Sequence, residues 1–363
     1  MSGTTVAGRG LAGAVGRFVS VPEAHARYDT DPDSAARWLR LPAEAIAGLA
    51  EAGVPHRADP GRGPLFDYID LVNIAMFSGS GQSVPELALR FLLRFAASPP
   101  ASWYKPRDWL VGIRLPQAPG DPAPPVRVRV PDLGAEGVSV VPEAAARGLS
   151  PPASTDPLAE GYRAVVRLAG ARRTIRDRRV RAVCTEVVQA LTRGTVVYQT
   201  VPESLRTVHH QAWTLGMADC IVVSRLLADR IRELGRPARA RRGYLLGLVG
   251  SDHAWCEVYE DACWKQLDAV FAYVASGGGR DRNLAMDAPE FAAACFGSRF
   301  NRLLPCVADE AAPLVYFGAQ PAPPWALAGV SASPWRPPDG PVSIGASRPG
   351  EPMNAATSRR VDR

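Results

Sequence analysis

Hydrophobic residues recur every three or four positions after Cys220, which predicts an amphipathic helix over roughly residues 220–234. The apolar stripe consists of Val223, Leu227, Ile231 and Leu234. Cys220 falls on the same stripe, so its thiol is expected to point inward from the first turn. Asp219 is placed to cap the helix, and Gly235 followed by Pro237 ends it.

Downstream, polar and apolar residues alternate over Ser251–Tyr259 and again over Cys263–Asp268, which predicts a β-hairpin. One face of its first strand carries His253, Trp255, Glu257 and Tyr259. A turn centred on Glu260–Asp261 places His253 directly opposite Asp268, with Cβ atoms roughly 5 Å apart.

The remaining pattern divides the chain into blocks. Residues 1–19 and 318–363 are predicted to be disordered, the latter because the segment is rich in Pro, Ser and Gly. Residues 20–115 form a mostly helical module, residues 116–158 a Pro-rich connector with two strand-like runs, and residues 159–317 a second domain. Helices are expected at Leu158–Leu168 and Val180–Leu191, ahead of the cysteine. The predicted class is α+β, with helices packed on an antiparallel sheet after a mostly helical domain.

The N-terminal module has a recognisable order of elements. Short helices are expected at Ala35–Leu39 and Pro42–Ala52, and a turn-rich segment, Arg57–Pro64, leads into a helix that starts at an Asp. This order is similar to small winged helix-turn-helix domains. The second helix, however, offers two glutamates and no Arg, Asn or Gln for base edges or phosphates. A role in protein docking or in shaping a substrate site fits better than DNA reading.

Composition sets outer limits. The chain of 363 residues has room for about two domains, and its 47% hydrophobic content is ample for a packed core. Lys105 and Lys265 are the only lysines among 42 basic residues, and this Arg-, Ala-, Gly- and Pro-rich composition suggests a GC-rich genome such as an actinobacterium's. The net charge of +6 permits acidic partners. The arginine runs of the chain are typical of a solvated surface, so nucleic-acid binding is not expected.

The six cysteines include no CxxC pair and no histidine at metal-ligand spacing from a pair, so neither a metal nor a cofactor is expected. Leu11–Gly16 is too short for a secretion signal, and Arg17 interrupts it. No run approaches the ~20 apolar residues of a membrane span. These patterns favour a cytoplasmic protein with reduced cysteines.

Cys220, His253 and Asp268 are the three residue types that thiol-based acyl transfer uses. Unpaired N–H groups and the positive end of the helix dipole at Cys220 favour a reactive thiolate, and Asp219 opposes this unless its carboxylate is engaged in capping. Asp268 can accept from one imidazole nitrogen and leave the other for the thiol. Two other interpretations stay open: a cysteine that only packs, and a solvated His–Asp pair on an ordinary hairpin.

At these residues the chain resembles the transglutaminase-like superfamily, a branch of the papain-like cysteine fold. The matching features are the Cys220 helix with the run Gly235–Arg239 after it, Gly243-Tyr244, His253–Tyr259, and Trp264 shortly before Asp268. The resemblance covers less than half of the chain. It implies that Cys220 is the nucleophile, His253 the general base and acid, and Asp268 the residue that orients the imidazole.

The resemblance also suggests residues around the reacting atoms. Relatives use an upstream Trp or Gln in the oxyanion hole, which makes Gln211 and Trp213 candidates. Trp255 and Glu257, on the His253 face, are candidates for substrate contact. The context Ala218-Asp219-Cys220 departs from the commoner Gly-X-Cys form, which puts the substrate class in doubt.

The expected function is cysteine-dependent acyl transfer through an acyl-thioester. Amide-bond formation in a biosynthetic pathway is one reaction of this kind. The acyl donor would be a peptide, a protein side-chain amide or a carrier-bound thioester, and the acceptor an amine or water. Peptide or amide hydrolysis, as in cysteine proteases, is therefore an open alternative. A second alternative is a non-catalytic interaction protein or DNA-associated regulator, in which residues 20–115 serve docking.

Overall fold

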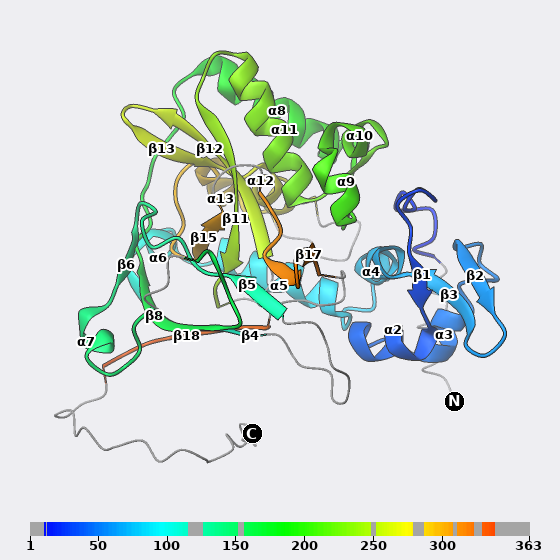
Figure 1. The fold of residues 1–363 in the computed structure, drawn as a ribbon. Coiled ribbons are helices and arrows are strands. Elements are labelled where there is room, and N and C mark those ends of the chain that lie inside the picture. The colour runs from blue at the N-terminus through cyan, green and yellow to red at the C-terminus, as the bar shows by residue number, and fades with distance from the viewer. Residues whose placement is uncertain are drawn as a thin grey trace, which may run out of the picture.

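The computed structural model describes residues 11, 13–114, 126–151, 156–247, 252–278, 287–307, 311–322 and 329–337. Helices and strands are mixed, as expected for an α+β protein. At the centre is a five-stranded antiparallel sheet of order β14-β13-β12-β11-β15 (Figure 1). Its strands are β11 (Ala238–Leu245), β12 (Asp252–Glu260), β13 (Cys263–Leu267), β14 (Phe296–Gly297) and β15 (Leu303–Val307).

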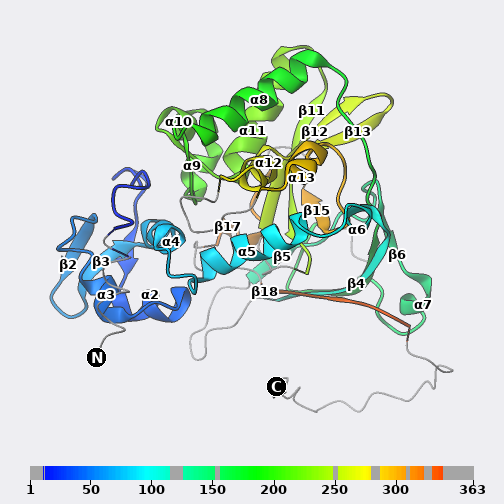
Figure 2. The same cartoon turned by 180° about the vertical axis from the view of Figure 1, so that it is seen from behind.

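Helices cover this sheet and bury its apolar side chains. The predicted helix after Asp219 is α11 (Cys220–Glu233), which packs on β11 and β12, and α8 (Arg178–Thr192) packs beside it (Figures 1 and 2). The segment before Cys220 contains α9, α10 and a short parallel pair of strands, β9 and β10. The bounds are α9 (Glu203–Thr207), α10 (His209–Thr214), β9 (Val197–Tyr198), β10 (Met217–Ala218), α12 (Ala269–Ala275) and α13 (Pro289–Ala294).

The predicted hairpin is present as β12–β13, but its turn is Asp261–Ala262 rather than Glu260–Asp261. Both turn residues have positive φ, 55° and 58°, as a two-residue hairpin turn requires. Glu257 therefore lies opposite Gln266, and His253 is not opposite Asp268. The expected register was wrong by two residues. Because side chains alternate with a period of two, a shift of two leaves His253 and Asp268 on the same face.

The segment predicted as a helix at Leu158–Leu168 is extended instead. It forms β7 (Leu158–Ala159) and β8 (Tyr162–Leu168), and β8 pairs with β4 (Arg107–Arg114) and β6 (Val138–Val140). Arg163 and Arg167, four apart, imitate a helical polar face. The residues between them are buried on both faces of the strand, where β-branched valines pack well.

Both ends of the chain were predicted to be disordered. The parts of them that the structure describes contribute to the fold. In the C-terminal block, β18 (Gly329–Pro334) pairs with β4 along its length. The Pro-rich connector provides β5 (Val126–Arg129), which pairs with β7 and β16, and the other elements here are α7 (Pro142–Ala145), β16 (Val315–Phe317) and β17 (Gln320–Pro321). At the N-terminus, Leu11, Ala14 and Phe18 are buried in the main core. The disorder predicted for residues 1–10, 12 and 338–363 concerns positions outside the described residues.

The N-terminal module has the expected order of elements, although its likeness to winged domains stays a prediction. Two short helices precede a hairpin whose second strand runs directly into a helix capped by Asp67. The elements are β1 (Tyr28–Thr30), α2 (Pro32–Leu39), α3 (Ala43–Ala47), β2 (His56–Asp59), β3 (Gly63–Asp67) and α4 (Tyr68–Phe77). Figures 1 and 2 show this module at one side of the molecule, beside α9.

The next two helices join the N-terminal half of the chain to the central sheet. They are α5 (Val84–Ala96), which begins with a capping box between Ser83 and Glu86, and α6 (Ala101–Tyr104). Phe95 and Trp103 make edge-on contacts with Phe291 at ring-centroid distances of 5.5 and 5.0 Å. This aromatic packing puts α5 and α6 in the same hydrophobic core as α11 and α12.

In the part of the chain that the structure describes, no helix is both long enough and apolar enough to cross a membrane.

Candidate active site

Cys220 is the first residue of α11, and Asp219 caps that helix. The Asp219 Oδ1 atom accepts hydrogen bonds from the N–H groups of Ile221 and Val222, both at 3.0 Å. Its Oδ2 atom accepts from Arg206 Nε at 2.7 Å. The carboxylate that would oppose a thiolate is thus engaged in capping and in an ion pair. Among the described residues, the Cys220 N–H has no acceptor, so this donor stays available at the helix start.

His253 lies near the start of β12 and is only 5% exposed. Its Nε2 donates to Asp268 Oδ2 at 2.6 Å. Asp268 directly follows β13, and its other oxygen accepts from Phe271 N at 2.9 Å, which caps α12. The Phe271 ring stacks on the imidazole, with centroids 4.1 Å apart and planes 16° from parallel. The hydrogen bond from Phe271 N and the stacked Phe271 ring together fix the orientation of the carboxylate and the imidazole.

The Cys220 sulfur is close enough to His253 to raise the pKa of the imidazole. Asp268 occupies Nε2, which leaves Nδ1 as the nitrogen available to the sulfur. Burial disfavours the charged imidazolium, but the Asp268 carboxylate and the Cys220 sulfur outweigh it and raise the pKa of His253 to about 10. The raised pKa keeps the imidazole protonated near neutral pH beside the Asp268 carboxylate.

A partly buried ion network joins the residue before Cys220 to the residue before His253. Arg206 bonds both Asp219, at 2.7 Å, and Glu203, at 2.9 Å. Arg242 bonds Glu203 at 3.1 Å, and its Nε bonds Asp252 at 2.9 Å. Burial alone would raise the pKa values of Glu203 and Asp252, but the two arginines hold both below their usual values. The network ties the start of α11 to the start of β12 and so sets the spacing of the two candidate reacting groups.

Trp255 and Glu257 share the His253 face but do not contact the sulfur. Trp255 is buried and donates from Nε1 to Glu257 Oε1 at 3.2 Å. Glu257 also accepts from Arg239 Nε at 2.8 Å and lies 3.7 Å from Arg241 Nε. Glu257 is thus paired with two arginines within the protein.

Gln211 and Trp213 lie away from the site. Gln211 is exposed, and Trp213 packs against Arg230, whose guanidinium carbon is 5.6 Å from the ring centroid. Arg230 is in the last turns of α11, about 15 Å along the helix axis from Cys220 at 1.5 Å per residue. Strand β10 turns the chain back before Cys220, so α10 packs beside the body of α11. The expected oxyanion role of these two side chains does not fit this placement.

Tyr198 and Gln199 lie beside Ala218, in the segment before Cys220, and no sequence pattern predicted this. Tyr198 of β9 pairs with Ala218, two residues before the cysteine, and its ring is 6.0 Å from that of Tyr273. Gln199 exchanges two hydrogen bonds with the backbone of Val19, at 2.7 and 2.8 Å. A two-residue parallel pairing leaves no periodic signal, and the Gln199 contact spans 180 positions, so no local pattern could reveal either one.

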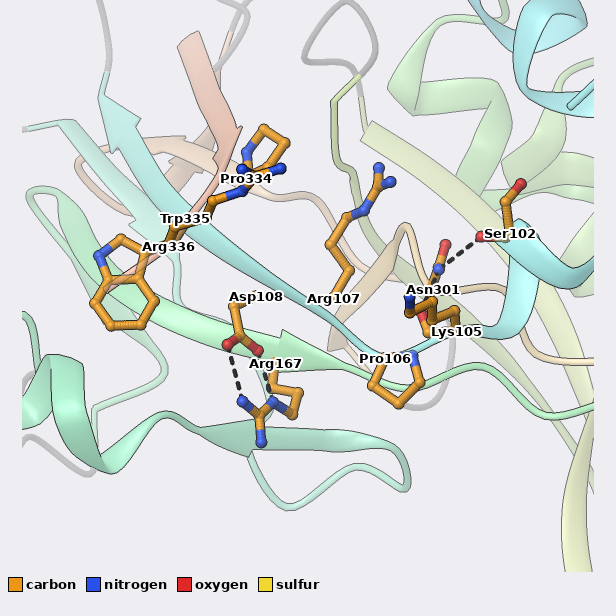
Figure 3. A pocket seen from close by; sticks show the side chains of 10 residues that line it. All are labelled: Ser102, Lys105, Pro106, Arg107, Asp108, Arg167, Asn301, Pro334, Trp335 and Arg336. Carbon is orange, nitrogen blue, oxygen red and sulfur yellow. Dashed lines mark hydrogen bonds and ion pairs between the residues drawn. The ribbon is translucent and has the colours of Figure 1, made fainter. Parts of the chain in front are cut away.

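Two hollows lie elsewhere, and neither is lined by Cys220, His253 or Asp268. The larger, about 500 Å³, is bordered by Lys105, Arg107, Asn301 and Trp335, and by an Asp108–Arg167 ion pair of 2.6 Å (Figure 3). The other, about 420 Å³, is lined in part by Arg239, Arg241 and Glu257.

The six cysteines, all in the described ranges, are unpaired thiols. Within those ranges one group of side chains could ligate a metal, His209 with His210 and Asp229, and it includes none of the three candidate catalytic residues.

Comparison with known proteins adds little. No protein-family model matches the chain, and no curated protein does. Among solved structures it is similar to a "putative cysteine protease" from Cytophaga hutchinsonii, with 11% identity and a TM-score of 0.25, over 66% of this chain and 92% of that one. That TM-score is too low to establish a common fold or a common function.

Proposed function

We propose that the protein is a cysteine-dependent acyl-transfer enzyme that works through an acyl-thioester at Cys220. The proposal is supported by a buried imidazole whose Nε2 is bonded to the Asp268 carboxylate and whose pKa is raised by both Asp268 and the Cys220 sulfur. A packing cysteine does not need a buried histidine with a raised pKa beside it. A solvated His–Asp pair would not be 5% and 4% exposed.

The reaction follows from these positions. His253 Nδ1 holds the thiol proton, and the thiolate attacks an amide or thioester carbonyl carbon. The Cys220 N–H, at the positive end of α11, donates to the oxyanion that develops. The imidazolium then protonates the leaving amine or thiol. Finally an amine or water, deprotonated by His253, attacks the acyl-thioester and releases the Cys220 thiol.

The test is intact-protein mass spectrometry after iodoacetamide, across pH, on wild type and three variants. We expect one fast-labelling cysteine, lost in Cys220→Ala and slowed near neutral pH in His253→Ala. Cys263→Ala is the matched control, because Cys263 is also only partly buried, and it should keep the fast phase. Uniformly slow labelling at all six cysteines would contradict the proposal and favour a non-catalytic interaction protein.

The acceptor, amine or water, separates transferase from hydrolase. Incubation with an N-acetylcysteamine thioester should add one acyl mass to wild type and none to Cys220→Ala. Adding an excess of a primary amine then decides the outcome. An amide product supports transfer, including amide synthesis, whereas a carboxylate alone supports the hydrolase alternative.

The contacts of the N-terminal module support a docking or substrate-shaping role. Asn73 of α4 exchanges two hydrogen bonds with the backbone of Thr200, at 3.0 and 2.8 Å. Thr200 lies between β9 and α9, in the segment that leads to Cys220. Arg57 and Arg62 of the hairpin are paired with Glu23 and Asp59, which leaves little charge there for phosphates. The module is therefore proposed to bind a protein partner or substrate and not a nucleic acid.

A further inference from the structure

Two consecutive histidines at the start of α10 converge on one carboxylate of α11. His209 Nε2 and His210 Nε2 lie 2.7 and 3.0 Å from the same atom, Asp229 Oδ2. Their rings are 4.4 Å apart between centroids, at 38°. Neighbouring residues on a helix normally point about 100° apart, so convergence on one oxygen is an unusual use of two side chains. From this arrangement we infer that His209, His210 and Asp229 bind a divalent transition-metal ion.

The distances suit a metal centre. Ligand atoms about 2.1 Å from a zinc-like ion, at angles of about 90–110°, are about 3.0–3.4 Å from one another. The two N···O distances are within a few tenths of an ångström of that range, and the three ligand atoms all lie within 4.8 Å of one another. Small side-chain rotations are enough to admit an ion, with no movement of α10 or α11.

The second carboxylate oxygen of Asp229 is held within the protein. Arg232 donates to the other oxygen of Asp229 at 3.1 Å, which leaves Oδ2 for the ion.

The donor set indicates which ions fit. Two imidazole nitrogens and one carboxylate oxygen suit Zn²⁺, Co²⁺, Ni²⁺ or Cu²⁺, whereas Mg²⁺ and Ca²⁺ prefer oxygen ligands. The His210 side chain is 60% exposed and that of Asp229 31%, so water has access to the remaining coordination position. Arg225 and Arg232 oppose the added positive charge and moderate the affinity.

The position of this cluster argues for a clamp and not for a catalytic centre. Asp229 is nine residues after Cys220, about 13 Å along α11. The ion would tie α10 to the helix that carries the candidate nucleophile. Spacing along the sequence did not reveal the cluster, because the carboxylate comes 19 residues after the nearer histidine.

The experiment uses the full chain as Cys220→Ala, so that the candidate nucleophile cannot bind the probe. Zn²⁺ binding is measured by calorimetry, and Co²⁺ binding by its visible absorption, which reports nitrogen and oxygen ligation without sulfur bands. We expect one equivalent of each ion, and at least about tenfold weaker binding in His210→Ala and Asp229→Asn. His56→Ala, at another exposed histidine, is the matched control and should bind as the parent does.

Absence of stoichiometric Zn²⁺ and Co²⁺ binding would overturn the inference. So would binding that is unchanged in His210→Ala and in Asp229→Asn, or Co²⁺ spectra dominated by thiolate bands. Because His210 is exposed, its replacement should leave the fold intact, and circular dichroism of each variant checks this. A rise in the melting temperature with Zn²⁺, present in His56→Ala and lost in His210→Ala, would support the clamp.

Discussion

Replacing Asp268 with Asn isolates the charge that holds His253. Asn is also a good N-cap, so the hydrogen bond from Phe271 N that starts α12 should remain. The substitution removes the carboxylate 2.6 Å from His253 Nε2 and leaves the imidazolium buried with a neutral partner. The expected consequence is a loss of stability that depends on pH.

The magnitude follows from the pKa of His253, which is 6.5 in its ordinary state and about 10 here. At 1.36 kcal/mol per unit, this difference corresponds to roughly 5 kcal/mol, shared between Asp268 and Cys220. A hydrogen bond to a charged group contributes about 1.5–3 kcal/mol. We therefore expect Asp268→Asn to lower the free energy of unfolding by about 2 kcal/mol.

The pH dependence gives the test its sign. Because the pKa is raised in the folded protein, the stabilisation is complete below about pH 6.5 and is lost as the pH rises towards 10. Urea unfolding of wild type and Asp268→Asn should differ most at about pH 6 and converge at about pH 10. Asp268→Ala also removes the cap and should lose about 1 kcal/mol more at every pH. A difference between wild type and Asp268→Asn that does not change with pH would refute the reasoning.

Two further predictions concern other buried carboxylates. Glu203→Gln removes a charged partner of Arg206 and Arg242. It should lower the free energy of unfolding at about pH 7 by about 1–2 kcal/mol. Because the pKa of Glu203 is held below 4.5, this loss should be complete above about pH 4.5 and fade as the pH falls further, and equal stability at neutral pH would contradict it. The same variant should slow iodoacetamide labelling of Cys220, since the network spaces α11 from β12. Burial and the nearby Asp67 raise the pKa of Asp70 to about 7, although a hydrogen bond from Val21 N lowers it. The Oδ2 atom of Asp70 has no partner among the described residues. Asp70→Asn keeps an acceptor for Val21 and should therefore stabilise the protein by about 2 kcal/mol above pH 7 and by little at about pH 4. Urea unfolding at the two pH values checks this, and a less stable variant at about pH 8 would be the contrary result.

Much of the local structure could be predicted from pattern alone. The helix after Asp219 and the hairpin are where periodicity placed them, because a buried helix face and a half-buried strand each impose their own spacing on apolar residues. The hairpin register was wrong by two residues, because Glu260-Asp261-Ala262 contains no glycine or asparagine to mark the two turn positions. His253 and Asp268 still met, because their shared face depends only on parity.

Other errors came from packing that no local pattern records. Segment 158–168 is a strand because β4 and β6 flank it, and residues 329–334 are ordered because β4 offers them an open edge. Trp213 had the right residue type for an oxyanion hole, but the turn at β10 carries it towards Arg230. Each of these outcomes depends on a partner far away in the sequence.

The sequence by itself determined which residues could do thiol chemistry and which elements carry them. Helix capping, strand alternation and residue type are local properties, and they placed Cys220, His253 and Asp268 at the ends of their elements. Only the tertiary structure decided that the half-buried sulfur lies near the buried imidazole and carboxylate, and that Arg206, Glu203 and Arg242 connect their supports. It also brought Asp229 to His209 and His210. Apart from the Glu203–Arg206 pair, these contacts join residues 13 to 39 positions apart through helix–sheet packing, whose geometry depends on the whole core and not on any short segment.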